Sequence, residues 1–103
     1  EIRPVSVDAA NAPRVKADIV GPICETGDYL ARSREIPLPR QDDLLALGSA
    51  GAYGAVQAGT YNSRLLVPEV LVNGDQFHVI RPRPTYDELI DLDSLPDWLE
   101  DKA

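Results

Sequence analysis

The sequence predicts a mainly-β domain with short helices, built as a small barrel or sandwich. Nine prolines and seven glycines interrupt its 103 residues so often that long helices are disfavoured. Short runs of alternating apolar and polar residues recur in the first part of the chain, as is typical of strands with one buried face. An Asn73-Gly74 pair between two runs rich in β-branched residues is a strong local indication of a β-hairpin.

Two alternating runs predict the first strands. Residues 2–7 read as a strand, and Pro4 favours an edge position because proline cannot donate to a ladder. Residues 14–24 alternate again, and Gly21-Pro22 should bend or end that strand. A domain closed from such strands would still lack one strand, which we expect from elsewhere.

The middle of the chain is more broken. Residues 32–43 are polar and contain two prolines, which predicts an extended surface connection. Residues 44–50 predict a buried strand, and the alanine-rich residues 52–59 predict about two turns of helix stopped by Gly59.

The last third begins with the hairpin at residues 69–80, where Asn73-Gly74 should form a type I′ turn. A capping box then opens a helix at residues 85–92, because Glu88 follows Thr85 by three residues. A further helical turn is expected at residues 94–99, with Trp98 and Leu99 docking the end of the chain.

Charge is unevenly distributed within the net value of −7. Residues 87–103 contain seven acids and one lysine, whereas residues 1–86 contain ten acids and nine bases. A body without a basic excess argues against nucleic-acid binding. We therefore expect one β-domain over residues 1–103, with residues 85–103 as an acidic helical tail that favours solubility.

The single cysteine, Cys24, excludes an internal disulfide, and with one histidine it argues against a metal centre. No apolar run approaches the roughly 20 residues that span a bilayer. The single thiol fits a reducing, cytoplasmic setting best. The chain starts at Glu1 with no methionine or targeting segment, so we expect it to be a piece of something longer.

Cys24 allows two interpretations. After an apolar strand, a lone cysteine is usually a small buried hydrophobe, and spacing alone favours that view. However, the polar residues 25–28 fit poorly inside a core strand, which predicts that Cys24 lies at a strand end facing a cleft. There the thiol could donate a proton, and Glu25 could bind a cationic substrate group.

Tyr53 is a second candidate, because it follows a strand and a glycine-containing turn at the start of a short helix. Its phenol and nearby amides could bind a phosphate or carboxylate, although an ordinary half-buried tyrosine fits equally well. His78 is better explained as a structural residue, and Arg81 and Arg83 as partners of the acidic tail.

Four motifs, in order, resemble the C-terminal domain of the diaminopimelate decarboxylase family, which are pyridoxal-phosphate enzymes of the alanine racemase/ornithine decarboxylase fold type. The similarity runs from about Val20 to Leu92, and its motifs are "CETGD", "GAYG", "YNSR" and "EVLV". Thr26 stands where serine is commoner in the family, which keeps a hydroxyl.

The resemblance implies a partner. In this family an N-terminal (β/α)8 barrel carries the Schiff-base lysine for pyridoxal 5′-phosphate, and the protein's N-terminus supplies the first strand of the β-barrel domain. Lys16 and Lys102 are the only lysines here, and neither has the sequence context of that lysine. The chain alone is therefore expected to be inactive, and to work with the barrel portion in a homodimer whose active site lies at the interface.

The resemblance also implies roles for three residues. Cys24 matches the family's proton donor, Glu25 matches a carboxylate that contacts the substrate, and Tyr53 matches a tyrosine at the cofactor and substrate. Tyr61 and Asn62 match a motif near the site without a catalytic role.

The implied reaction is decarboxylation of meso-2,6-diaminopimelate to L-lysine. A decarboxylase for ornithine, arginine or a carrier-bound substrate is the alternative within the fold type. A free-standing barrel that only binds or dimerises is the alternative if the chain is complete.

Overall fold

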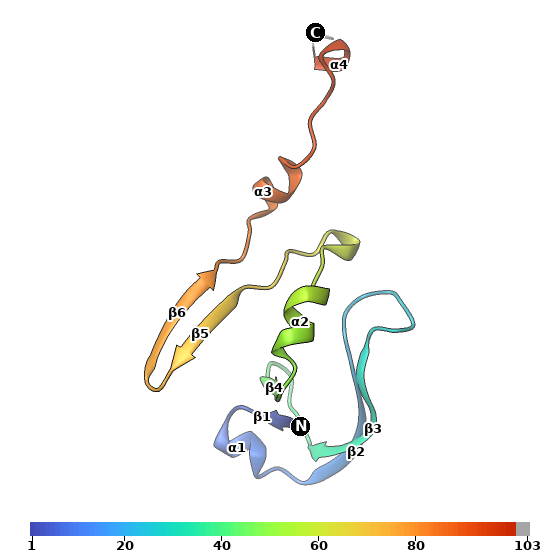
Figure 1. Cartoon of the computed structure of the whole chain (residues 1–103). Helices are drawn as coiled ribbons and strands as arrows, with labels where there is room; N and C mark the ends of the chain where they lie inside the picture. The colour runs from blue at the N-terminus through green and yellow to red at the C-terminus, as the bar shows by residue number, and fades with distance from the viewer. Residues whose placement is uncertain (101–103) are drawn as a thin grey trace. The chain divides into compact units, whose positions relative to one another are not determined.

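The structure, a computed structural model, describes residues 1–100. Its elements are β1 (Ile2–Pro4), α1 (Val7–Ala10), β2 (Arg14–Val20), β3 (Tyr29–Pro37), β4 (Leu45–Leu47), α2 (Gly51–Gln57), the 3-10 helix η1 (Tyr61–Ser63), β5 (Glu69–Asn73), β6 (Gln76–Arg81), α3 (Tyr86–Ile90) and α4 (Asp97–Glu100) (Figure 1). The chain divides after Val56 into two compact units. Each unit is described by itself.

The first unit is organised around the antiparallel pair of β2 and β3, which share the longest ladder of the described residues. Pairing runs from Arg14 opposite Pro37 to Val20 opposite Tyr29. The ladder is irregular around Asp18, whose Oδ1 accepts a hydrogen bond of 2.7 Å from the backbone N–H of Ser33. This bond satisfies an amide at a left-handed residue, since Ser33 has φ 48°.

The core of the first unit is small. Its buried aliphatic side chains are Ile19, Ala31 and Ile36, with Ile2 and Ala17 packed partly against them. Ile19 lies opposite Ala31 in the ladder, so one face of the β2–β3 pair holds the core. Apolar burial on this face is the main force that holds the hairpin in register.

Strand β3 corrects the expectation of an extended surface connection over residues 32–43. Residues up to Pro37 are in the strand, and Ile36 is only 2% exposed. Three charged residues of this strand are exposed: Arg32, Arg34 and Glu35. They make the sequence look like a polar loop, although one face of the strand is buried. Only the remainder, from Leu38 to Asp43, is a loop.

Strands β1 and β4 form a second antiparallel pair of three residues each. The expected strand over residues 2–7 ends early, because the Ser6 hydroxyl accepts a 3.1 Å hydrogen bond from Ala9 and caps helix α1. The strand expected over residues 44–50 is also shorter and less buried, with Leu44 70% exposed.

The second unit contains the hairpin of β5 and β6, which the sequence predicts. The turn differs by one residue, however, because Asn73 pairs with Gln76 and leaves Gly74 and Asp75 as the turn. Gly74 has φ +63° and Asp75 has a negative φ, as in a type II′ turn with glycine first, not a type I′ turn.

The β5–β6 hairpin has one apolar face. Val70 lies opposite Val79, and Val72 lies opposite Phe77, so all four side chains share that face. They are between 45% and 74% exposed. At the open end of the hairpin, where the register shifts, Glu69 and Arg81 form an ion pair of 3.4 Å.

Helix α3 confirms the predicted capping box. The Thr85 hydroxyl accepts from the Glu88 N–H at 3.1 Å, and the Glu88 carboxylate accepts from the Thr85 N–H at 3.3 Å. Helix α4 supplies the further expected turn, but Trp98 is 71% exposed and Leu99 44% exposed, so the expectation that they dock is wrong. The end of the expected acidic tail, residues 101–103, lies outside the described residues.

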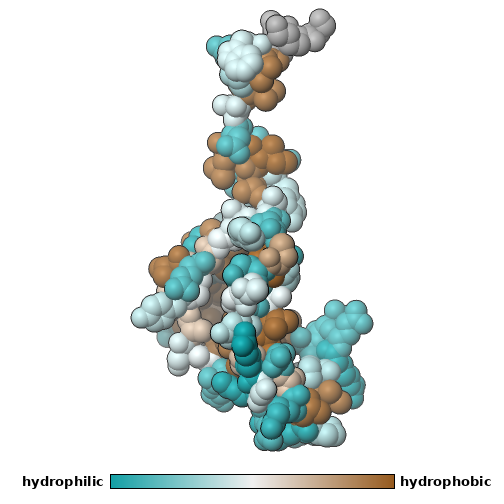
Figure 2. Space-filling model, turned by 90° about the vertical axis from the view of Figure 1, so that its right-hand side faces the viewer, coloured by the Kyte–Doolittle hydropathy of each residue, from teal (hydrophilic) through white to brown (hydrophobic). Residues whose placement is uncertain are grey.

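The mainly-β class with short helices is confirmed. Across residues 1–100 the strands form three separate two-stranded sheets, which are open, and no barrel is closed. Figure 2 shows apolar side chains, in brown, at the surface of both units. None of the described helices is long and apolar enough to cross a membrane.

Candidate functional site

The loop between β2 and β3 carries Cys24 and Glu25, and both side chains are exposed. Strand β2 ends at Val20, immediately before Gly21-Pro22, as the sequence predicts. The alternative of a buried cysteine inside a strand is therefore wrong. The loop connects β2 to β3, and these two strands carry the buried core residues of the first unit. The packed strand pair therefore supports both ends of the loop.

Backbone hydrogen bonds give this loop a defined course. The Gly21 N–H donates to the Asp28 carbonyl at 2.9 Å, which extends the ladder by one step. The Glu25 N–H donates to the Ile23 carbonyl at 2.9 Å, and the Asp28 N–H donates to the Glu25 carbonyl at 3.1 Å. Cys24 thus lies between two residues whose main chains are both engaged.

The Glu25 carboxylate points back toward its own loop. Its Oε2 accepts from the Gly27 N–H at 2.7 Å, and its Oε1 accepts from the Thr26 hydroxyl at 3.4 Å. A substrate ammonium group would compete with the longer of these bonds first. The threonine hydroxyl thus contacts the carboxylate that the resemblance assigns to substrate binding.

Tyr53 lies in helix α2, near its N-terminal end, and is 74% exposed. A Cβ atom added to Gly51 or Gly54 would meet no atom within 4 Å apart from its chain neighbours and the helix backbone, so this part of the helix surface is open. The phenol is therefore free to reach a group outside this chain. A phenol hydroxyl can donate to a phosphate or a carboxylate.

The described residues include one lysine, Lys16, which is exposed on β2 opposite Glu35. The candidate loop lies at the other end of the same ladder, beyond the pair of Val20 and Tyr29. The β2–β3 loop therefore brings together a thiol and a carboxylate, Cys24 and Glu25, whereas the Tyr53 phenol is carried separately by helix α2. These three groups suit the edge of a pyridoxal-phosphate site. Lys16 does not lie where it could complete that site.

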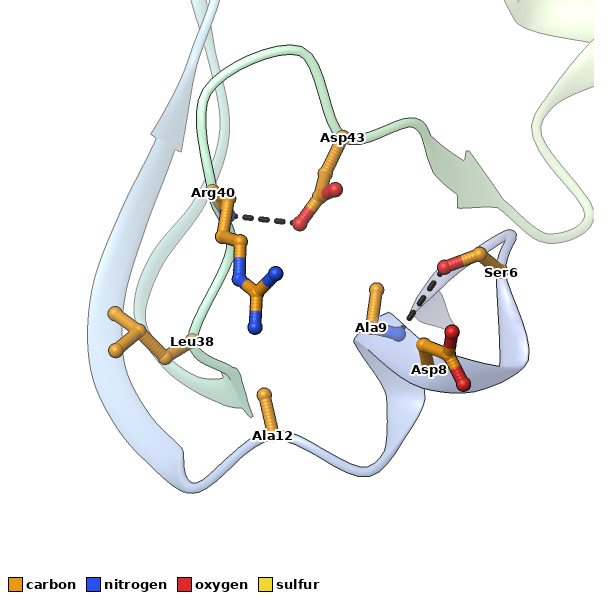
Figure 3. Close-up of a pocket in the computed structure, with 7 residues that line it drawn as sticks. All are labelled: Ser6, Asp8, Ala9, Ala12, Leu38, Arg40 and Asp43. Carbon is orange, nitrogen blue, oxygen red and sulfur yellow. Dashed lines mark hydrogen bonds between the residues drawn. The ribbon is translucent and has the colours of Figure 1, made fainter.

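Three pockets formed by described residues, one beside α1, one beside α3 and one at the β5–β6 hairpin, are not lined by Cys24, Glu25 or Tyr53. The pocket in Figure 3 has a volume of about 80 Å³ and is lined by Ser6, Asp8, Ala9, Ala12, Leu38, Arg40 and Asp43. Within it, Asp43 accepts a 2.7 Å hydrogen bond from the Arg40 N–H. Its volume is below the roughly 300–1,000 Å³ of small-molecule sites, so it is a gap between α1 and the β3–β4 loop.

Two other residues that the sequence analysis singled out, Arg81 and Asn62, lie in the second unit. Arg81 pairs with Glu69 and donates to the Val67 carbonyl at 3.0 Å, which corrects its expected pairing with the acidic tail. Asn62, in η1, has a left-handed backbone with φ 58°. No cluster of three or more metal-ligating side chains occurs among residues 1–100.

Asp28 is the residue of this loop that sequence reasoning missed. Its Oδ2 accepts a hydrogen bond of 2.6 Å from the Ile23 N–H, and its side chain is partly buried. The five-residue separation corresponds to no standard turn motif, so only the folded loop reveals the contact. In the sequence, Asp28 is only one more polar residue of the loop before β3, so no local pattern marks it.

Comparison with known proteins identifies the family. Residues 1–51 match the model of the "Pyridoxal-dependent decarboxylase, C-terminal sheet domain". Diaminopimelate decarboxylase of Zymomonas mobilis is 45% identical over 95% of this chain, and that of Archaeoglobus fulgidus is 51% identical over 79%. The solved diaminopimelate decarboxylase of M. jannaschii, in complex with L-lysine, superposes with a TM-score of 0.83 at 33% identity over 96% of this chain.

The chain spans 25% of the length of the Zymomonas protein, 19% of the Archaeoglobus protein and 22% of the M. jannaschii structure. These relatives therefore extend well beyond the part that matches. The matches in sequence and in structure agree over most of the chain, so it belongs to the pyridoxal-dependent decarboxylases, as part of their C-terminal sheet domain.

Proposed function

We propose that this chain is the C-terminal part of a diaminopimelate decarboxylase, which converts meso-2,6-diaminopimelate to L-lysine and carbon dioxide. The observation that carries the proposal is identity of 45–51% to two diaminopimelate decarboxylases over most of the chain. The bound L-lysine of the M. jannaschii relative is the product of this reaction.

The activity needs a second part of the protein. Pyridoxal phosphate, when bound, supplies the electron sink for loss of the carboxylate. In the proposal, an N-terminal barrel portion holds most of the cofactor, and two such proteins form a homodimer. Tyr53 would contact the cofactor from helix α2, and its 74% exposure leaves the phenol available for this.

Cys24 is proposed as the proton donor. Loss of carbon dioxide leaves an electron pair on the α-carbon, and that carbon must gain one proton. The Cys24 Sγ–H would deliver this proton and recover it from solvent, which balances the reaction. An exposed thiol on an ordered loop can be placed against a reacting group of a neighbouring subunit.

Glu25 is proposed to bind an ammonium group of the substrate. Its carboxylate now accepts from Thr26 at 3.4 Å and from Gly27 at 2.7 Å, so one oxygen is held more tightly than the other. The loosely held oxygen can turn to the substrate while the bond to Gly27 keeps the side chain in place. A bond between an ammonium and a carboxylate, in which both partners are charged, is stronger than the 3.4 Å bond from a neutral hydroxyl that it replaces.

A substrate comparison tests the proposal. The complete protein that contains this chain, loaded with pyridoxal phosphate, is assayed for carbon dioxide release from meso-diaminopimelate, ornithine and arginine. We expect turnover of diaminopimelate with L-lysine as product, at least a hundredfold faster than of the others. Faster turnover of ornithine or arginine would contradict the substrate, and no turnover of any would contradict the enzyme class.

The role of Cys24 has its own test. Replacing Cys24 by alanine is expected to lower kcat about 10²-fold to 10⁴-fold, the usual contribution of a positioned acid, and to leave the bound cofactor unchanged. The measurements are steady-state kinetics and cofactor content per protein. If cofactor were lost while turnover per bound cofactor stayed the same, Cys24 would be a structural residue instead.

A further inference from the structure

The Asp28 carboxylate lies at the centre of the loop that presents Cys24. Asp28 makes three hydrogen bonds within the loop. Its backbone carbonyl accepts from the Gly21 N–H, its N–H donates to the Glu25 carbonyl, and its carboxylate accepts from the Ile23 N–H. The last bond, of 2.6 Å, is the shortest of the three. This bond holds the backbone N–H of Ile23, the residue that precedes Cys24.

The space that this carboxylate occupies is open only because residue 21 is glycine. A Cβ atom built on Gly21 would overlap both carboxylate oxygens and the carboxyl carbon of Asp28. The φ of Gly21 does not lie in the left-handed region, so its lack of a side chain serves close approach here, not backbone freedom. The absence of a side chain at Gly21 thus makes room for the Asp28 carboxylate.

The surroundings leave the carboxylate no other assigned partner among the described residues. The cation nearest in sequence, Arg32, lies over the Tyr29 ring at 4.1 Å. The carboxylate of Asp28 thus directs one oxygen at a backbone N–H. An amide oxygen in the same place could accept the same bond.

We propose that Asp28 is a positioning residue for the decarboxylation reaction, which holds the main chain at Ile23 so that the Cys24 thiol meets the reacting carbon. This inference rests on the proposed function, because it acts through Cys24. The physical reason is that proton transfer requires close and aligned atoms, and a displacement of about 1 Å can cost about 10²-fold in rate. In this proposal Asp28 acts through the main chain at Ile23, not by contact with the substrate or the cofactor.

The test uses the complete, cofactor-loaded decarboxylase that contains this chain. Asp28→Ala removes the acceptor, and we expect kcat to fall 10-fold to 10²-fold, with KM for diaminopimelate changed less than threefold. Asp28→Asn keeps an acceptor of the same size, and we expect kcat within about threefold of the parent protein. Asp75→Ala, which removes an exposed carboxylate from the β5–β6 turn, is the matched control and should be neutral.

Gly21→Ala reaches the same loop by a separate route. The added methyl group displaces the Asp28 carboxylate without removing it, so kcat should fall as in Asp28→Ala. Hydrogen exchange of the segment from Val20 to Tyr29 gives a readout besides activity. We expect faster exchange in Asp28→Ala and Gly21→Ala and parent-like exchange in Asp28→Asn.

A double-mutant cycle with Cys24→Ser tests whether Asp28 acts through the thiol. In the Cys24→Ser background, Asp28→Ala should lower kcat less than twofold further. Full additivity, or an Asp28→Asn variant as slow as Asp28→Ala, would overturn this inference and leave the proposed function standing. A Cys24→Ser variant with parent kcat would instead overturn the proposed role of Cys24, and this inference with it.

Discussion

Ile36 offers a sharp test of the core in the first unit. It is 2% exposed, lies opposite Val15 in the β2–β3 ladder, and belongs to the buried cluster with Ile19 and Ala31. Ile36→Ala removes three carbons, and about 0.8 kcal/mol per buried carbon gives about 2.4 kcal/mol from transfer alone. The cavity left behind adds to this, so we expect a loss of about 3 kcal/mol within the usual range of about 2–5.

Two further variants, one at position 36 and one at position 35, give stability losses with which the loss in Ile36→Ala is compared. Ile36→Val removes one carbon and should cost about 1 kcal/mol. Glu35→Ala changes the neighbouring residue, which faces solvent, and should change stability by less than about 0.5 kcal/mol.

The assay is urea unfolding of the complete protein, followed by circular dichroism, with hydrogen exchange of the β2 and β3 segments to assign the loss to this unit. A cost for Ile36→Ala no larger than that for Glu35→Ala would refute the argument. It would mean that the side chain at position 36 does not hold β3 against β2.

Further predictions concern the second unit. Thr85→Ala should destabilise α3 by about 1 kcal/mol because the capping hydroxyl is lost; faster hydrogen exchange of the Leu89 amide would report it, and unchanged exchange would count against the cap. Gly74→Ala should destabilise the β5–β6 hairpin by about 1–2 kcal/mol, because φ is +63° there. Gly59→Ala is its control, since open space surrounds that position, and equal losses of melting temperature for both would contradict the turn assignment.

Local chemistry explains which parts of the fold could be predicted. The capping box of Thr85 and Glu88 depends on residues three apart, and the break at Gly21-Pro22 depends on backbone restrictions of those two residues. Both were correct from the sequence. The turn after Asn73 was displaced by one residue, because Asn73 pairs with Gln76 and only the register of the whole hairpin decides which pair turns.

Strand β3 was missed because its identity depends on a distant partner. Its exposed charges conceal the alternation, and Ile36 becomes a core residue only when β2 lies opposite. The candidate site shows the same division. Motifs pointed to Cys24, Glu25 and Tyr53, whereas the contact of Asp28 with the Ile23 amide required a folded loop.

The three separate two-stranded sheets have a practical consequence for handling this chain. Each strand has a neighbour on one side only, so each presents a row of backbone donors and acceptors that a further strand can join. Together with the exposed valines and phenylalanine of the hairpin, these rows make the chain prone to self-association when it is produced alone. Co-expression with the remaining portion of the decarboxylase should keep it dispersed, and light scattering would measure the difference.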